Sequence, residues 1–184
     1  MEFLIAGLVV FFGTHLIPIF QGIRTVLRSK LGKKPYQAIY SLMSLTGFVL
    51  IIYGMGQSDF IPLYEPPEWG RHLTGLFMLL GLYCLISGYV KSSFRRISAH
   101  PMLWGFSLWA IGHLLANGDL ASLLLFGSFL AYALVDMLSA NKRGATPPGI
   151  SFQWLGDIKV LAIAVVVLVI MVLAHPYMAG MPIY

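Results

Sequence analysis

The run VLAIAVVVLVIMVLA at Val160–Ala174 decides the fold, because it contains no charged or hydrogen-bonding side chain. Five further runs are long and nearly free of charge: Phe3–Phe20, Tyr36–Met55, Leu73–Val90, Pro101–Ala116 and Leu120–Val135. Each approaches the roughly 20 residues that cross a bilayer, although the fourth and sixth runs in chain order need neighbouring residues to span. None alternates apolar and polar residues as a barrel strand does, so these runs satisfy their backbone groups in lipid as helices. The sequence predicts an all-α, polytopic membrane helix bundle of about six transmembrane helices, a single domain over residues 1–184.

The composition also makes lipid the main solvent of this chain. Of the 184 residues, 58% are hydrophobic and only 10% are charged, and the mean hydropathy is +0.82. A water-soluble globule of this size could not bury so much apolar surface. The first run opens with Glu2 instead of a basic segment, so we interpret it as a retained helix and not as a secretory signal. The single cysteine, Cys84, excludes a disulfide within the chain and covalent haem attachment, and we expect it to pack.

The cations predict the orientation. All but one of the twelve Lys and Arg lie in three segments: Arg24, Arg28, Lys30, Lys33 and Lys34; Lys91, Arg95 and Arg96; and Lys142, Arg143 and Lys159. The intervening segments hold only Arg71. Because basic loops resist translocation, we expect these three segments in the cytoplasm and both termini outside. Topology and anionic membrane lipids explain the net charge of +5, and we predict no nucleic-acid partner.

The connecting segments carry capping and turn residues. Asn117-Gly118-Asp119 predicts a tight turn with Asp119 capping the following helix, which makes the helices on either side an antiparallel hairpin. The acidic, proline-rich loop over residues 57–69 is expected to be a connector, with a binding lid as the alternative. Near the inner end of its run, Asp136 is expected to pair with Arg95, Arg96 or Lys142, with proton handling as the alternative.

Two of the five histidines lie within hydrocarbon depth, His15 in the first run and His113 in the fourth. An ionisable side chain inside a span is costly, so by default it faces the interior and marks a site. Neutral imidazole commonly ligates haem iron, and two histidines on different helices can bind one iron from opposite faces. The alternative for each is a hydrogen bond between helices.

Helical spacing and depth refine this hypothesis. Trp109 lies one turn before His113, and Phe11 and Phe12 precede His15 on its face, an aromatic lining that would suit a flat macrocycle or plain packing. At about 1.5 Å per residue, His15 lies about 18 Å and His113 about 5 Å from the outer ends of their runs, an offset of about 13 Å. A pair of His15 with His100 is the geometric rival.

The segment from His100 to Ser122 resembles the NnrU family. The matching residues are His100-Pro101-Met102-Leu103-Trp104-Gly105, then Leu108-Trp109-Ala110, then His113 through Ser122 (HLLANGDLAS), with Gly13-Thr14-His15 and Arg24 near the first helix. No hydrolase triad, HExxH, P-loop or dinucleotide fingerprint is present. The resemblance implies a bacterial inner-membrane protein associated with denitrification, usually with nitric oxide or nitrite reductase systems.

The same domain is similar to zeta-carotene isomerase, which uses haem b for redox-dependent isomerisation. His15 and His113 match its histidines, so the resemblance implies haem b with His15, His113 and the neighbouring Trp109 at the cofactor, and His100 as the alternative iron ligand. The isomerase carries a cysteine where this chain has Ala110. Haem binding is therefore favoured over isomerisation of a lipophilic substrate.

Three functional hypotheses follow. The first is a haem b protein that serves nitrogen-oxide respiration or acts on a lipophilic substrate. The second is a non-enzymatic assembly protein that contacts a respiratory nitrogen-oxide reductase through its basic loops. The third rests on a more distant likeness from Arg96 through His100-Pro101 to Gly105, which resembles isoprenylcysteine-type membrane methyltransferases and implies S-adenosylmethionine at the cytoplasmic face.

Overall fold

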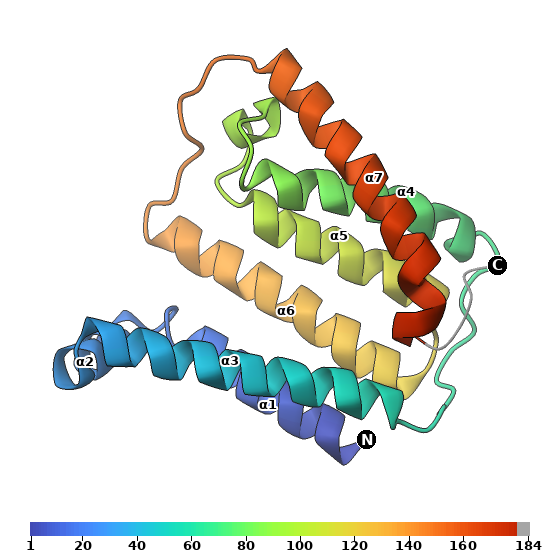
Figure 1. The fold of residues 1–184 in the computed structure, drawn as a ribbon, viewed down its shortest axis with the longest axis horizontal. Coiled ribbons are helices and arrows are strands. Elements are labelled where there is room, and N and C mark those ends of the chain that lie inside the picture. Colours follow the sequence, from blue (N-terminus) through green and yellow to red (C-terminus); the bar gives the residue numbers. More distant parts are fainter. Residues whose placement is uncertain (180–184) are drawn as a thin grey trace. The chain divides into compact units, whose positions relative to one another are not determined.

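The computed structural model describes residues 1–179, and every element of regular secondary structure within that range is a helix, which confirms the all-α prediction. The elements in chain order are α1 (Glu2–Leu16), α2 (Gln21–Leu31), α3 (Lys33–Gly56), α4 (Gly70–Ser87), the 3-10 helix η1 (Ser93–Arg96), α5 (Pro101–Ala116), α6 (Leu120–Lys142) and α7 (Trp154–Ala179). They form two compact units, Met1–Ile61 and the chain from Pro62 onward (Figure 1).

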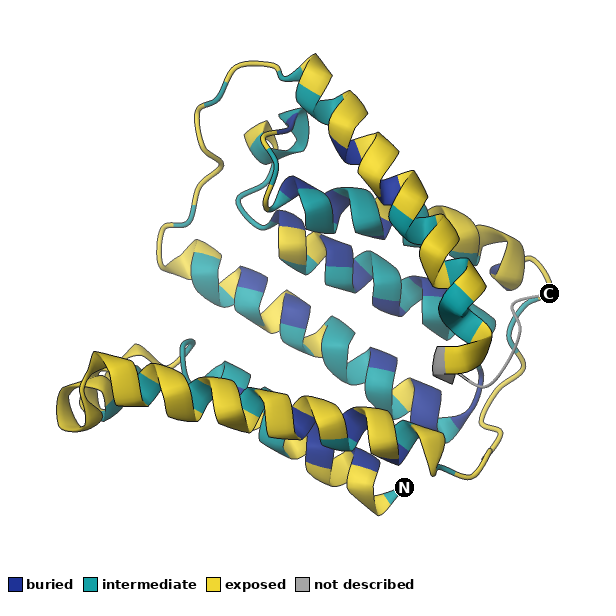
Figure 2. Ribbon diagram, viewed as in Figure 1, coloured by how far each residue is buried: buried dark blue, intermediate teal, exposed yellow. Residues whose placement is uncertain are grey.

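Each of the six apolar runs appears as a helix. Four helices, α3, α4, α6 and α7, are long and apolar enough to cross a membrane. The pair α1 and α2 adds a fifth candidate if its bend of 87° is one broken span, and α5 is a shorter apolar helix of 16 residues. The expectation of about six spans is consistent with this set. Large apolar side chains are exposed along these helices, as Figure 2 shows for α3 and α7, because lipid is their solvent.

In the first unit, α1 packs along α3 through glycines. A methyl group added at Gly7 would lie 2.6 Å from the backbone nitrogen of Ile51, and one added at Gly54 would lie 2.2 Å from that of Leu4. Such close backbone approach is how membrane helices gain van der Waals contact without a hydrophobic driving force. α1 ends at Leu16, two residues before Pro18, which lacks the amide hydrogen a continued helix would need.

The second unit is a row of four helices. α5 packs against both α4 and α6, and α7 packs on α4 (Figure 1). Gly81 of α4 and Gly105 of α5 bring their helices together, since a methyl group at Gly105 would lie 2.8 Å from the carbonyl oxygen of Gly81.

At one end of the second unit, the turn between α5 and α6 forms as predicted. The Asp119 carboxylate accepts a hydrogen bond from the backbone nitrogen of Ser122 at 3.0 Å, which confirms it as the N-cap of α6. The loop over residues 57–69 contacts this turn, because the backbone nitrogens of Leu63 and Tyr64 both donate to the carbonyl oxygen of Gly118, at 2.8 and 3.1 Å.

The opposite end of the second unit joins the end of α4 and η1 to the start of α7. The Asp157 carboxylate accepts hydrogen bonds from the Tyr83 hydroxyl at 2.9 Å and from the Ser93 backbone nitrogen at 2.7 Å. The Ser93 hydroxyl accepts from the backbone nitrogen of Gln153 at 2.9 Å. We call this the basic end, because it holds Lys91, Arg95, Arg96, Lys142, Arg143 and Lys159. Two of the three basic segments thus gather at one end of this unit.

Candidate functional site

His15 lies near the end of α1, next to aromatic side chains of α1 and α3. Its Nδ1 is 2.7 Å from the carbonyl oxygen of Phe11, one turn back. The imidazole stacks on the Phe11 ring at 4.1 Å, and the Tyr40 ring of α3 lies 5.7 Å away. A carbonyl oxygen can only accept, so Nδ1 carries the hydrogen and the Nε2 of the neutral ring carries the lone pair.

His113 of α5 repeats the same arrangement in the second unit. Its Nδ1 donates to the carbonyl oxygen of Trp109 at 2.9 Å. The imidazole stacks on Phe126 of α6 at 4.4 Å with an interplanar angle of 19°, and the Trp109 ring lies 5.2 Å away. The Trp109 ring also packs edge-on against Phe129 at 5.2 Å. The structure thus brings the predicted cofactor residue Trp109 to His113 within an aromatic cluster.

The structure separates His100 from His113. They lie at opposite ends of α5, about 20 Å apart at 1.5 Å per residue. His100 immediately precedes α5 and belongs to the basic end, where its Nε2 lies 2.7 Å from Oδ1 of Asn141 on α6. That oxygen accepts, so His100 carries its hydrogen on Nε2 and presents Nδ1 as the acceptor, the tautomer opposite to that of His15 and His113.

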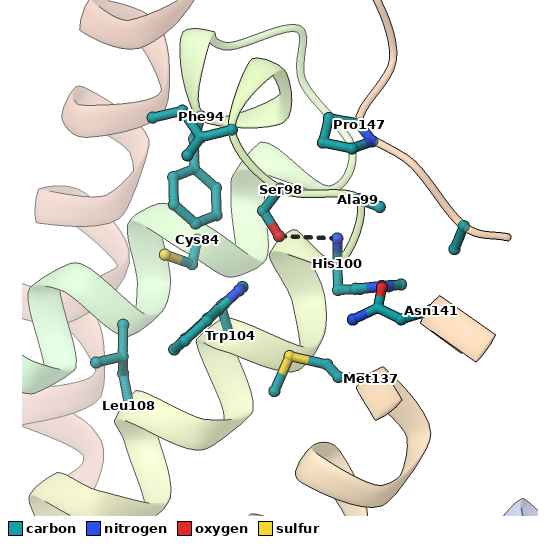
Figure 3. Close-up of a pocket in the computed structure, with 12 residues that line it drawn as sticks. Cys84, Phe94, Ser98, Ala99, His100, Trp104, Leu108, Met137, Asn141 and Pro147 are labelled. Carbon is teal, nitrogen blue, oxygen red and sulfur yellow. Dashed lines mark hydrogen bonds between the residues drawn. The ribbon is translucent and has the colours of Figure 1, made fainter. Parts of the chain in front are cut away.

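A cavity of about 470 Å³ opens at His100. It is lined by Cys84, Phe94, Ile97, Ser98, Ala99, His100, Trp104, Leu108, Met137, Asn141, Ala145 and Pro147. Figure 3 shows the His100 ring against the Asn141 amide on one side of the cavity and Cys84 below Phe94 on another. The volume lies within the range of small-molecule sites, and a few polar groups on mostly apolar walls are typical of such sites.

Sequence reasoning found only part of this cavity. The His-Pro pair before α5 pointed to His100, and Cys84 was expected to pack, as its exposure of 6% confirms. Asn141 was missed as a partner of His100, because it lies 41 residues further along the chain. In the sequence it is a single amide residue next to Lys142 and Arg143, and it belongs to no motif that would mark it as a site residue. Side-chain identity alone does not reveal which helix ends meet.

Asp136 has a partner other than the three predicted from the sequence. Its carboxylate lies 3.8 Å from the guanidinium of Arg143, at the end of α6, and 3.5 Å from the Tyr132 hydroxyl. Arg143 can reach Asp136 because it lies two turns along the same helical face. The expectation of a structural ion pair is confirmed, and the expected partners Arg95, Arg96 and Lys142 are wrong.

No three His, Cys, Asp or Glu side chains within residues 1–179 lie close enough to hold a metal ion. Haem iron needs fewer ligands from the protein than a bare metal ion does, because the macrocycle supplies the equatorial nitrogens and the protein supplies only the axial ligands. The lone pair that the tautomers of His15 and His113 leave on Nε2 is the donor chemistry that such an iron requires.

Comparison with curated proteins finds no match, and neither does comparison with solved structures. Comparison with protein families finds NnrU, described as NnrU protein, over residues 3–183 of the 184. The match runs through both units, including the segments of His15, His100 and His113. The chain therefore belongs to the NnrU family.

Proposed function

We propose that this membrane protein binds haem b and that His15 and His113 supply iron ligands through Nε2. The observation that carries this proposal is the hydrogen bond that each ring donates from Nδ1 to the carbonyl oxygen one turn back. Histidines that bind metal usually donate their other ring nitrogen to a carbonyl or carboxylate, which fixes the tautomer and raises the basicity of the ligating nitrogen.

The surroundings of the two histidines support a flat apolar cofactor. Phe11 and Tyr40 flank His15, and Phe126 and Trp109 flank His113. Ala110, where the related isomerase carries cysteine, is fully buried and offers no ligand, so ligation by histidine alone is proposed. Bound haem would supply one-electron redox chemistry. Within a bilayer, the partners of that chemistry are a lipophilic substrate or another membrane protein, and the denitrification association of the family favours a nitrogen-oxide reductase in the bacterial inner membrane.

The test is the visible absorption spectrum of detergent-purified protein, oxidised and then reduced with dithionite. We expect a Soret band and b-type reduced peaks that are lost or shifted in His15→Ala and in His113→Ala. His72→Ala, an exposed histidine at the start of α4, is the matched control and should leave the spectrum unchanged. If the Soret band and reduced peaks were lost only in His100→Ala, His100 would be assigned as the iron ligand instead. Colourless protein that still restores reductase assembly would replace the proposal with the helper function.

The cavity at His100 favours methyl transfer as a second candidate function. It lies at the basic end, which the charge distribution assigns to the cytoplasm, where a soluble methyl donor would be available. This candidate predicts saturable binding of S-adenosylmethionine, measured by calorimetry, that His100→Ala or Arg96→Ala abolishes. Absence of any binding in the wild-type protein would remove it.

A further inference from the structure

A second cavity, of about 270 Å³, lies in the first unit where α1 gives way to α2. We call it the elbow cavity, and its lining residues are Pro18, Arg24, Tyr36, Gln37, Tyr40 and Ser41. Pro18 belongs to the break after α1, Arg24 to α2, and the remaining four to the first turns of α3. Three consecutive elements therefore enclose it.

The chemistry of the elbow cavity fits an anion. Arg24, which is half-buried, brings a guanidinium, and the tyrosine and serine hydroxyls and the Gln37 amide can all donate hydrogen bonds. No acidic residue lines the cavity, residues 21–36 contain none, and no acidic side chain of the described chain pairs with Arg24. A guanidinium fork with hydroxyl donors around it matches the oxygens of a phosphate group.

The course of α2 places this cavity at a membrane surface. Because α2 leaves α1 at 87°, a membrane-crossing α1 directs α2 along the plane of the bilayer. Ile23, Val26 and Leu27 fall on one face of α2, and no residue of α2 is buried. Exposures of 52% for Ile23 and 50% for Val26 leave that apolar face uncovered by protein. An amphipathic, cationic helix of this kind lies in the interface, with its apolar face among acyl chains.

We propose that the elbow cavity binds the phosphate group of an anionic phospholipid, with Arg24 as its main contact. Arg24, Arg28 and Lys30 of α2 and the cations that follow attract an anionic leaflet, and the cavity then selects the headgroup. The proposal does not rest on haem binding, since Arg24 carries it, although Tyr40 belongs to both sites because its ring also lies 5.7 Å from that of His15.

The experiment measures which lipids stay bound. Protein reconstituted in nanodiscs of mixed phosphatidylcholine and phosphatidylglycerol is extracted into detergent, and native mass spectrometry counts the lipids that remain. We expect wild-type protein to retain phosphatidylglycerol preferentially. Arg24→Ala should lower that retention about tenfold, the change expected when charge-assisted hydrogen bonds to a phosphate are lost. Tyr36→Phe combined with Tyr40→Phe removes two hydroxyls while keeping both rings, and should also lower it.

Arg28→Ala is the matched control, because it removes the same charge from the same helix outside the cavity lining. An equal loss of phosphatidylglycerol retention in Arg24→Ala and Arg28→Ala would show that the lipid is held only by unspecific electrostatic attraction to α2. That result would overturn the proposal. Arg24→Gln, closer in volume to arginine, serves if Arg24→Ala does not fold, and unchanged retention in it would also overturn the proposal. Displacement of the lipid by millimolar inorganic phosphate would instead assign the site to free phosphate.

Discussion

At the residue scale, Tyr64 couples the loop over residues 57–69 to the end of α5. Its hydroxyl hydrogen is shared between the carbonyl oxygens of Leu114 and Asn117, at 2.5 and 2.6 Å. Burial, and then the nearby negative charge of Asp119, raise the pKa of Tyr64 above the usual 10.0. A raised pKa means that the folded chain keeps this proton longer than the unfolded chain. The stability that protonated Tyr64 contributes to the fold is therefore fully present below pH 10.0. It is lost as the pH rises through the folded-state pKa.

We predict that Tyr64→Phe lowers the free energy of unfolding by about 0.5–1.5 kcal/mol at neutral pH, because one shared hydrogen bond is lost. Above pH 10.0, stability should fall more steeply in the wild type than in the variant. Thermal unfolding in detergent, followed by circular dichroism across that range, measures both effects. Tyr89→Phe, at a tyrosine that is 77% exposed, controls for general alkaline effects. Parallel pH profiles for wild type and Tyr64→Phe would contradict the prediction.

Individual residues were predictable where the signal is local. The Asp119 cap and the turn before it follow from three adjacent residues, and the histidines stood out by their depth in apolar runs. The pairing of His100 with Asn141 depends instead on which helix ends meet. The partner of Asp136, Arg143, lies two turns along the same helix, a local spacing that could have indicated it. The iron ligands stay a prediction, because the tautomers of His15 and His113 fit ligation without testing it.

At the element scale, the packing of α1 on α3 depends on glycine. A methyl group at Gly54 would lie 2.2 Å from the nitrogen and 2.6 Å from the Cα of Leu4, both backbone atoms that cannot rotate away. We predict that Gly54→Ala destabilises the protein by about 1–3 kcal/mol or more, since the two helices must separate. The measurement is the midpoint of unfolding by sodium dodecyl sulfate, followed by circular dichroism.

Gly13→Ala is the matched control for this prediction. No heavy atom lies within 4 Å of the methyl group it would add to α1, so only helix propensity changes, by up to about 1 kcal/mol in favour of alanine. We therefore expect Gly13→Ala to be neutral or stabilising. Similar losses in both variants would show that the close approach of α1 and α3 is not what Gly54 provides.

The six helices that follow apolar runs were predictable, whereas α2 and the short 3-10 helix η1 were missed. Residues 21–31 were assigned to the basic loop between the first two predicted helices, yet they form α2. Its apolar residues recur at helical spacing, as in Ile23, Val26 and Leu27, and Pro18 separates it from α1. A short amphipathic helix in the membrane interface contains no long apolar run. A search for apolar runs long enough to cross a bilayer therefore does not detect it.

At the scale of the whole molecule, the sequence predicts where the helices lie along the chain better than it predicts which helices pack against one another. Transmembrane helices such as α7 are apolar on every side, so no stripe marks the face that packs. In the structure, Val160 and Ala164 of α7 are fully buried, whereas Leu173, which is just as apolar, is 70% exposed. The order of the second unit, with α4 between α5 and α7, follows from glycine contacts and from hydrogen bonds at helix ends.

The charge distribution predicts which end of the second unit faces the cytoplasm. In the second unit, Lys91, Arg95, Arg96, Lys142, Arg143 and Lys159 share the basic end, while Glu65, Glu68 and Asp119 belong to the opposite end. Because Lys and Arg are retained on the cytoplasmic side, the basic end should face inward. In a Cys84→Ser background, a membrane-impermeant maleimide should therefore label Glu68→Cys in intact cells and Thr146→Cys only after permeabilisation. Both positions are exposed, so access depends on the side of the membrane and not on packing. The reverse pattern would invert the orientation and place the His100 cavity outside, away from any cytoplasmic methyl donor.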